Sequence, residues 1–180
     1  VQMKQNLLFD FLNVEWLRPE SALWNAIAAY VLQDCRFELE RPVLDLGAGN
    51  GLFSFIAAGG SLSLDYDCYL HVANLDQFWE NADIYDHFSK QGLSSYIKQR
   101  PSRRFDYAFD HKENLRKQAA FLDFYDCYRI GDANAEWPFE AHSLRSIFSN
   151  MLYWLKSPEH CFTEITRILE IGGKAFLCLQ

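Results

Sequence analysis

The residues best suited to binding a ligand are three glycines spaced two apart within 47–51. They follow the apolar run 43–46, which is short enough for a buried parallel strand, and apolar residues resume at helical spacing from Leu52. A strand, a glycine turn and a helix together direct backbone N–H groups and a helix N-terminus at a ligand. Side chains at the glycine positions would block that approach or forbid the turn. Asp45, two residues before the first glycine, places a carboxylate beside the same turn.

Strand and helix patterns alternate along much of the chain. This alternation predicts an α/β fold with a doubly wound, mainly parallel, Rossmann-like sheet and helices on both faces. The predicted strands cover residues 43–46, 105–110, 127–130, 146–150 and 174–179.

Two of the predicted helices carry apolar stripes that we expect to be buried. The first helix begins near Pro19, and its stripe consists of Leu23, Trp24, Ile27, Ala28, Val31 and Leu32. The second begins at Ser157 with proline in its first turn, and we expect the glycine pair 172–173 to stop it. The stripe of the second helix consists of Phe162, Ile165, Ile168 and Leu169.

The length of 180 residues suits one domain with a sizeable core, so we expect a single domain over 1–180. Residues 61–104 mix aromatic and acidic side chains without a clean period, and we interpret them as an insertion with short helices at 75–81 and 85–91. No metal site is predicted, because nothing fixes the possible ligands of this segment on a common face. Those possible ligands are His71, Asp76, Asp83, Asp86 and His87.

The glycine motif with Asp45 resembles the first motif of class I S-adenosylmethionine-dependent methyltransferases. Residues 131–177 are similar to the stretch of small-molecule methyltransferases that runs from the adenine-binding acid to the glycine pair of strand five. The resemblance covers 43–58 and 105–179. The segment 61–104 departs from the family pattern. The family also continues after strand five with a helix and two more strands, so we expect a truncation, a domain boundary or a sheet edge completed by something else there.

The resemblance implies S-adenosylmethionine as the cofactor, bound over the carboxyl ends of the strands. The glycine turn would hold its methionine part, with Asp45 accepting a hydrogen bond from the amino group or from a bridging water. The acid that ends strand two would accept the ribose hydroxyls, while Asp132 and Ala133 would contact adenine. The predicted cofactor-binding residues are Asp45, Gly47, Ala48, Gly49, Gly51, Asp110, His111, Asp132, Ala133, Ser149 and Asn150.

Two residues compete for the role of the ribose-binding acid. Asp65 lies at the family's usual distance after Asp45, and 61–65 could be a strand, but no helix pattern follows it. Asp110 ends an alternating aromatic run, a helix pattern follows it, and the stretch to Asp132 has room for one helix and one strand. We therefore choose Asp110. With Asp110, the insertion leaves from the end of the sheet away from the cofactor; with Asp65, it leaves from the cofactor end and would naturally form a substrate lid.

The predicted reaction is methyl transfer to a small-molecule acceptor by in-line displacement, in which the protein mainly orients the acceptor. No catalytic residue is predicted, because His111, His142 and His160 are ordinary surface or helix-start positions. Tyr153 and Trp154 follow strand four, where the family often lines the acceptor pocket, although core packing explains them almost equally well.

The alternative function is a non-catalytic S-adenosylmethionine-binding module or a partner subunit of an active methyltransferase. A nicotinamide oxidoreductase is disfavoured, because position 52 is leucine where G-x-G-x-x-G requires glycine.

Composition narrows the possible partners. The net charge of −7 disfavours binding to nucleic acid, and no apolar run has the length of a membrane span. The expected partner is therefore a small molecule, and the sequence indicates no oligomeric state. The odd number of cysteines and the absence of a C-x-x-C pair predict free thiols in a reducing, cytoplasmic setting. The cysteines are Cys35, Cys68, Cys127, Cys161 and Cys178.

Overall fold

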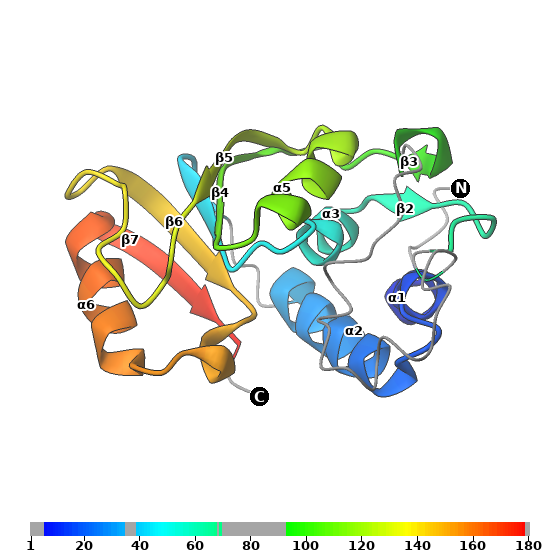
Figure 1. The fold of residues 1–180 in the computed structure, drawn as a ribbon, viewed down its shortest axis with the longest axis horizontal. Coiled ribbons are helices and arrows are strands. Elements are labelled where there is room, and N and C mark those ends of the chain that lie inside the picture. The colour runs from blue at the N-terminus through cyan, green and yellow to red at the C-terminus, as the bar shows by residue number, and fades with distance from the viewer. Residues whose placement is uncertain (1–5, 35–38, 68, 70–92, 179–180) are drawn as a thin grey trace. The chain divides into compact units, whose positions relative to one another are not determined.

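The computed structural model describes residues 6–34, 39–67, 69 and 93–178 (Figure 1). The chain forms two compact units. We call Arg36–Gly51 with Arg103–Gln180 the sheet unit, and Val1–Cys35 with Leu52–Ser102 the helical unit. That the 180 residues behave as a single domain stays a prediction.

The sheet unit contains a five-stranded, fully parallel sheet with the strand order β5-β4-β1-β6-β7. At the end of the central strand, Leu46 lies opposite Phe109 on one neighbouring strand and Ser149 on the other. The parallel α/β class predicted from the sequence is confirmed. The strands are β1 (Val43–Leu46), β4 (Phe105–Asp110), β5 (Tyr125–Ile130), β6 (Leu144–Ser149) and β7 (Leu169–Leu177).

On either side of β1, the chain connects each strand to the next one outward, from β4 to β5 on one side and from β6 to β7 on the other. The crossover from β4 to β5 and the crossover from β6 to β7 head toward opposite edges, so right-handed connections place their helices α5 and α6 on opposite faces. This agrees with the doubly wound arrangement. Figure 1 shows α6, in orange, beside β7. The helical elements of this unit are α5 (Glu113–Ala119), η3 (Ala120–Leu122), η4 (Leu152–Trp154) and α6 (Pro158–Ile168).

Helix α6 covers a core made of large apolar side chains. Its predicted stripe is confirmed at Ile165 and Ile168, which are buried. The prediction was wrong for Phe162, whose side chain is 45% exposed, because Cys161 occupies the inward position instead. The three buried apolar residues of α6 belong to one core cluster with residues of the sheet and its connections. The cluster consists of Leu44, Leu46, Phe109, Trp137, Phe139, Leu144, Ile147, Leu152, Cys161, Ile165 and Ile168.

The glycine pair 172–173 does not stop α6, so that prediction was wrong. The helix ends at Ile168, and β7 begins at Leu169, whose backbone is already extended. The pairing of β6 with β7 is irregular where the glycines lie, since Leu144 is opposite Leu169 but Ser146 is opposite Lys174. Gly172 has φ of +81°, a conformation that glycine adopts without strain. The glycines therefore accommodate extra residues within a strand.

The helical unit contains two helices, α1 and α2, that pack on each other. Ala22, Ala26 and Ala29 of α2 are buried, whereas most of the predicted stripe is exposed. The helix predicted from Pro19 is confirmed, but the prediction that its stripe is buried was wrong. The exposed members of the stripe are Leu23, Trp24, Ile27 and Val31. The elements of the unit are α1 (Leu7–Val14), α2 (Pro19–Asp34), α3 (Leu52–Ala57), β2 (Ser61–Leu62), η2 (Leu93–Tyr96) and β3 (Ile97–Gln99).

The described part of the segment 61–104 contains a small antiparallel pair, β2 with β3. Because β2 is not a strand of the five-stranded sheet, Asp65 does not end a strand of that sheet. The predicted helices at 75–81 and 85–91, and all the possible metal ligands of this segment, lie outside the described residues.

Three of the cysteines can be described: Cys127, Cys161 and Cys178 are free thiols. The states of Cys35 and Cys68, and the cytoplasmic setting, stay predictions. Among the helices that the structure describes, none combines the length and the apolar character needed to span a bilayer.

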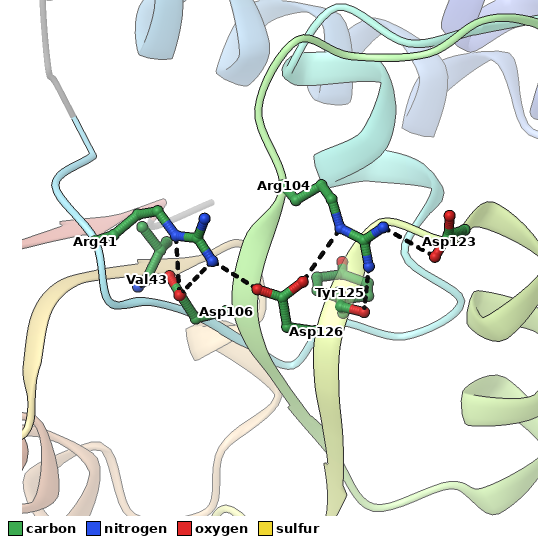
Figure 2. A network of polar contacts seen from close by, with 7 residues as sticks. All are labelled: Arg41, Val43, Arg104, Asp106, Asp123, Tyr125 and Asp126. Atoms are coloured by element: carbon green, nitrogen blue, oxygen red, sulfur yellow. Dashed lines mark hydrogen bonds and ion pairs between the residues drawn. The ribbon is translucent and has the colours of Figure 1, made fainter.

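A network of charged side chains joins the amino-terminal ends of β1, β4 and β5 (Figure 2). Arg41 bridges Asp106 on β4 and Asp126 on β5, at 2.6 and 2.5 Å. The other oxygen of Asp106 accepts a hydrogen bond from the Val43 N–H at 2.7 Å. Arg104 continues the network to Asp126 at 3.2 Å. Asp106 therefore ties the first residue of β1 to its neighbouring strand.

We expect the substitution Asp106→Ala to lower the free energy of unfolding by about 2 kcal/mol. Most of this loss comes from leaving the Val43 N–H without its acceptor. The exposed pair with Arg41 contributes little, because that guanidinium is more than half exposed and screened by water. Urea denaturation measures the change.

The matched control is Asp106→Asn, which removes the charge but keeps an oxygen that can accept from Val43. It should cost about half as much as the alanine substitution or less. Equal losses in the two variants would contradict this account and assign the effect to charge alone.

Candidate functional site

The glycine turn between β1 and α3 adopts a left-handed backbone. Gly47 has φ of +73° and Gly49 has φ of +57°. A Cβ atom on Gly47 would lie 1.9 Å from Cγ of Met151, so no side chain fits there. A Cβ atom on Gly49 would meet no atom of the described residues within 4 Å. Within the described part of the sheet unit, the space in front of Gly49 is therefore open, and a side chain would fill it.

Backbone N–H groups of this turn are used within the chain. Those of Gly47 and Ala48 both donate to the Phe109 carbonyl, at 2.8 and 3.3 Å, and that of Gly51 donates to the Ala48 carbonyl at 2.9 Å. The sequence led us to expect N–H groups directed at a ligand, and these three are directed elsewhere. Their hydrogen bonds hold the turn itself, and at Gly47 and Gly49 the missing side chain respectively avoids Met151 and leaves open space.

Asp110 ends β4 and lies beside the glycine turn. One of its carboxylate oxygens accepts from the Gly49 N–H at 3.0 Å, and the other accepts from the Lys112 N–H at 3.2 Å. The imidazole Nδ1 of His111 is 3.2 Å from the second oxygen. The predicted position of Asp110, at the end of the strand next to β1, is confirmed. Each carboxylate oxygen has two lone pairs, so these bonds leave capacity for ligand hydroxyls.

Asp45 is 2% exposed, although it carries a carboxylate. The hydroxyl of Tyr125, on β5, donates to its Oδ2 at 2.5 Å. From the same strand, the hydroxyl of Tyr128 donates to the Gly49 carbonyl at 2.6 Å. Burial raises the pKa of Tyr128, and the nearby charges of Asp110 and Asp45 raise it further, so its hydroxyl stays protonated and able to donate.

Sequence reasoning missed both tyrosines. Within a strand they look like ordinary apolar positions, and our predicted strand began only at Cys127. The two tyrosines could have been found from their positions on the strand that follows the Asp110 strand. That inference requires knowing the strand order, which the sequence does not give.

Asp132 and Ala133 follow β5 at the same edge of the sheet. The Asn134 backbone N–H and its side-chain amide both donate to Oδ1 of Asp132, each at 2.8 Å. These hydrogen bonds hold the pKa of Asp132 below its usual value, so it is a carboxylate at neutral pH. The Ala133 carbonyl accepts from the indole N–H of Trp137 at 3.0 Å. Both residues are therefore held in one conformation by their neighbours.

Ser149 and Asn150 lie where β6 ends. The Ser149 hydroxyl is buried and donates to the Leu46 carbonyl at 2.9 Å. It thus fastens β6 to β1, and a contact with a cofactor stays a prediction. The strand ends at Ser149, one residue earlier than predicted, so Asn150 belongs to the connection that follows.

All eleven predicted site residues lie in the sheet unit, within or after β1, β4, β5 or β6. The carboxyl ends of parallel strands meet at one edge, which is where open α/β sheets bind ligands. Within the described ranges, no group of three His, Cys, Asp or Glu side chains is placed to hold a metal ion.

Comparison with protein families gives one match. Residues 91–177 match the family model described as a methyltransferase domain. A comparison with curated protein sequences found no match.

Solved structures share the fold at low sequence identity. A Thermotoga maritima protein, described as a possible histamine N-methyltransferase, has a TM-score of 0.52 at 13% identity; the match covers 93% of this chain and 59% of that one. A Haloferax volcanii chain solved with the Trm112 methyltransferase activator has a TM-score of 0.51 at 18% identity, covering 97% and 61%. The [4+2]-cyclase SpnF has a TM-score of 0.51 at 13% identity, covering 88% and 45%. The chain thus spans 45–61% of the length of these structures.

The family match and the sheet order agree with the resemblance seen in the sequence. Residues 91–177 are similar to a methyltransferase domain, and the five-stranded parallel sheet has the Rossmann-like fold of such domains. The cofactor of that family is S-adenosylmethionine.

Proposed function

We propose that this chain binds S-adenosylmethionine over the carboxyl ends of β1, β4 and β5 and transfers the methyl group to a small-molecule acceptor by in-line displacement. The observation that carries the proposal is the open space in front of Gly49, beside the Asp110 carboxylate. The chemistry of the groups present fits the cofactor: carboxylates suit its ammonium, ribose hydroxyls and adenine amino group.

Each part of the cofactor has an assigned partner in this proposal. Asp45 attracts the ammonium of the methionine part, with its carboxylate oriented by Tyr125. Asp110 accepts the ribose hydroxyls, and His111 beside it is a further polar contact. Asp132 accepts the adenine amino group. The bound cofactor supplies a sulfonium with an activated methyl group.

The remaining task of the protein is to orient the acceptor. Tyr153 and Trp154 lie in η4, just after β6, with ring centroids 5.3 Å apart. The Trp154 side chain is 70% exposed. Exposed aromatic faces suit a flat apolar acceptor or a cationic amine. Histamine, the possible acceptor of the Thermotoga protein, is one such amine, and it guides the choice of acceptors to test.

Two observations are reasons to test the alternative function, a non-catalytic subunit, in the same experiment. SpnF is named a cyclase on the same fold, so the fold alone does not fix the reaction. The Haloferax structure is a complex with an activator protein, so a domain of this kind can act with a partner.

The test measures S-adenosylhomocysteine binding by calorimetry and then its release from S-adenosylmethionine with a panel of amines, phenols and carboxylic acids. The proposal expects micromolar-range binding and turnover with at least one acceptor. Binding without turnover across the panel would favour the non-catalytic alternative, and no binding would overturn the proposal. In an active pair, Trp154→Ala should raise the acceptor KM, whereas Phe162→Ala, an exposed aromatic on α6, should leave it unchanged.

A further inference from the structure

Three polar side chains of α6 point at one loop of the sheet unit. His160, Glu164 and Arg167 are spaced four and three residues apart, which puts them on the same face of the helix. The loop they contact follows β5, and we call residues 132–139 the adenine loop because it begins with the proposed adenine-binding pair. None of these three residues has a role in the proposed function.

Each of the three side chains binds the backbone of the adenine loop. The imidazole Nε2 of His160 lies 2.8 Å from the Ala135 carbonyl. The Glu164 carboxylate accepts from the Trp137 N–H at 2.8 Å. The Arg167 guanidinium donates to the carbonyls of Trp137 and Phe139, at 3.0 and 2.7 Å. Contacts to backbone atoms fix the path of the loop whatever its side chains are.

Glu164 and Arg167 also hold each other. The guanidinium donates to both carboxylate oxygens, at 2.9 and 2.6 Å, and Glu164 is 5% exposed. The hydrogen bonds from Arg167 are the main reason that the pKa of Glu164 lies below its usual value, so the pair is ionised. A bidentate ion pair whose carboxylate is buried and whose remaining groups are hydrogen-bonded has one favoured geometry. The support on the helix side of the loop is therefore rigid.

The support reaches the proposed adenine-binding pair through Trp137. Its indole is buried in the core and donates to the Ala133 carbonyl. The peptide that carries this carbonyl also carries the Asn134 N–H, which donates to the Asp132 carboxylate. One peptide plane is thus held by Trp137 on its carbonyl side and holds Asp132 on its N–H side.

We infer that Trp137 and the trio on α6 are positioning residues for adenine recognition, and this inference rests on the proposed function. They do not touch the base. They set the direction of the Ala133–Asn134 peptide and thereby the position of the Asp132 carboxylate, which would accept from the adenine amino group. The same contacts stabilise the fold, so the test must separate orientation from stability.

The experiment compares the affinities of S-adenosylhomocysteine and S-inosylhomocysteine, which has a carbonyl oxygen in place of the adenine amino group. Wild type should bind the adenine ligand about tenfold or more tightly than the analogue. In the analogue a carbonyl oxygen faces the Asp132 carboxylate, and two acceptors cannot form a hydrogen bond. Trp137→Phe keeps a ring in the core but removes the indole N–H donor. Arg167→Lys keeps the positive charge but removes the planar guanidinium with its several donors. In both variants the preference should fall at least about threefold toward equality.

Two further variants control for the helix itself. Thr163→Ala removes a hydroxyl that donates within α6, to the Glu159 carbonyl at 3.0 Å, and should keep the wild-type preference. His160→Gln, whose amide can still donate to Ala135, should keep more of the preference than His160→Ala. All variants are compared at temperatures where circular dichroism shows them folded, and Arg167→Lys carries the test if Trp137→Phe does not fold.

The outcomes are distinguishable. Equal weakening of both ligands, or an unchanged preference in Trp137→Phe and Arg167→Lys, would overturn the inference while leaving the proposed function standing. Wild type that binds neither ligand would overturn the proposed function and this inference with it. Wild type that binds both equally would show that Asp132 does not recognise the amino group, which also overturns the inference.

Discussion

Replacing Gly49 by valine is expected to weaken S-adenosylhomocysteine binding by at least about a hundredfold while the protein stays folded. The valine side chain would enter the open space in front of the turn, where the proposed cofactor lies. The cost to folding should be small, because no atom of the residues that the structure describes lies within 4 Å of the new Cβ. What remains is the strain of a β-branched residue at φ of +57°, about 1–2 kcal/mol. Calorimetry gives the affinity, and urea denaturation gives the stability.

Gly172 supplies a matched control for that strain. It also has a positive φ, +81°, and none of the described atoms lies within 4 Å of a Cβ placed there, but it lies in the irregular part of β7. Gly172→Val should therefore cost similar stability and keep wild-type affinity. Gly47 is unsuitable for this purpose, because its Cβ would collide with Met151 and disturb the packing. If Gly49→Val and Gly172→Val bind equally well, the open space is not the cofactor site.

The glycine turn illustrates what the sequence can and cannot predict. Three alternating glycines after a short apolar strand predict a turn with positive φ, because only glycine adopts that backbone freely. The pattern does not predict where the N–H groups of the turn point. That depends on the register between β1 and β4, which places the Phe109 carbonyl within reach of Gly47 and Ala48.

The errors in the helices have a related cause. Helical periodicity identifies an apolar face, but packing decides which face is buried. In α2 the buried positions are Ala22, Ala26 and Ala29, because small side chains let α1 approach closely. The glycine pair 172–173 has two ordinary uses, a helix stop or an irregular strand, and only the pairing of β6 with β7 distinguishes them.

The tyrosines beside the turn were missed for a different reason. Tyr125 and Tyr128 act on Asp45 and Gly49, which are far away in the sequence and not on the adjacent strand. Local pattern carries no information about such contacts. Asp110, in contrast, was found because the acid, the strand before it and the helix after it are neighbours in the sequence.

Asp110 is the subject of the second large expected effect. Asp110→Ala should weaken S-adenosylhomocysteine binding by about thirtyfold or more, since it removes two charge-assisted hydrogen bonds to ribose. The same substitution removes the acceptor for the Gly49 N–H, so it could also act through the shape of the turn. The 2′-deoxy analogue of the ligand separates the two effects, because it lacks one of the hydroxyls that Asp110 would bind.

Wild type should bind the 2′-deoxy analogue about tenfold more weakly than S-adenosylhomocysteine, and Asp110→Ala should bind the two about equally. Asp65→Ala is the control, since Asp65 follows β2 outside the five-stranded sheet, and it should behave like wild type with both ligands. Asp110→Asn keeps one oxygen for the Gly49 N–H and should lose the ribose effect while retaining the turn. If Asp65→Ala abolishes binding and Asp110→Ala does not, the ribose role belongs to Asp65. If Asp110→Ala weakens both ligands by the same factor, Asp110 acts on the turn alone and does not bind the ribose.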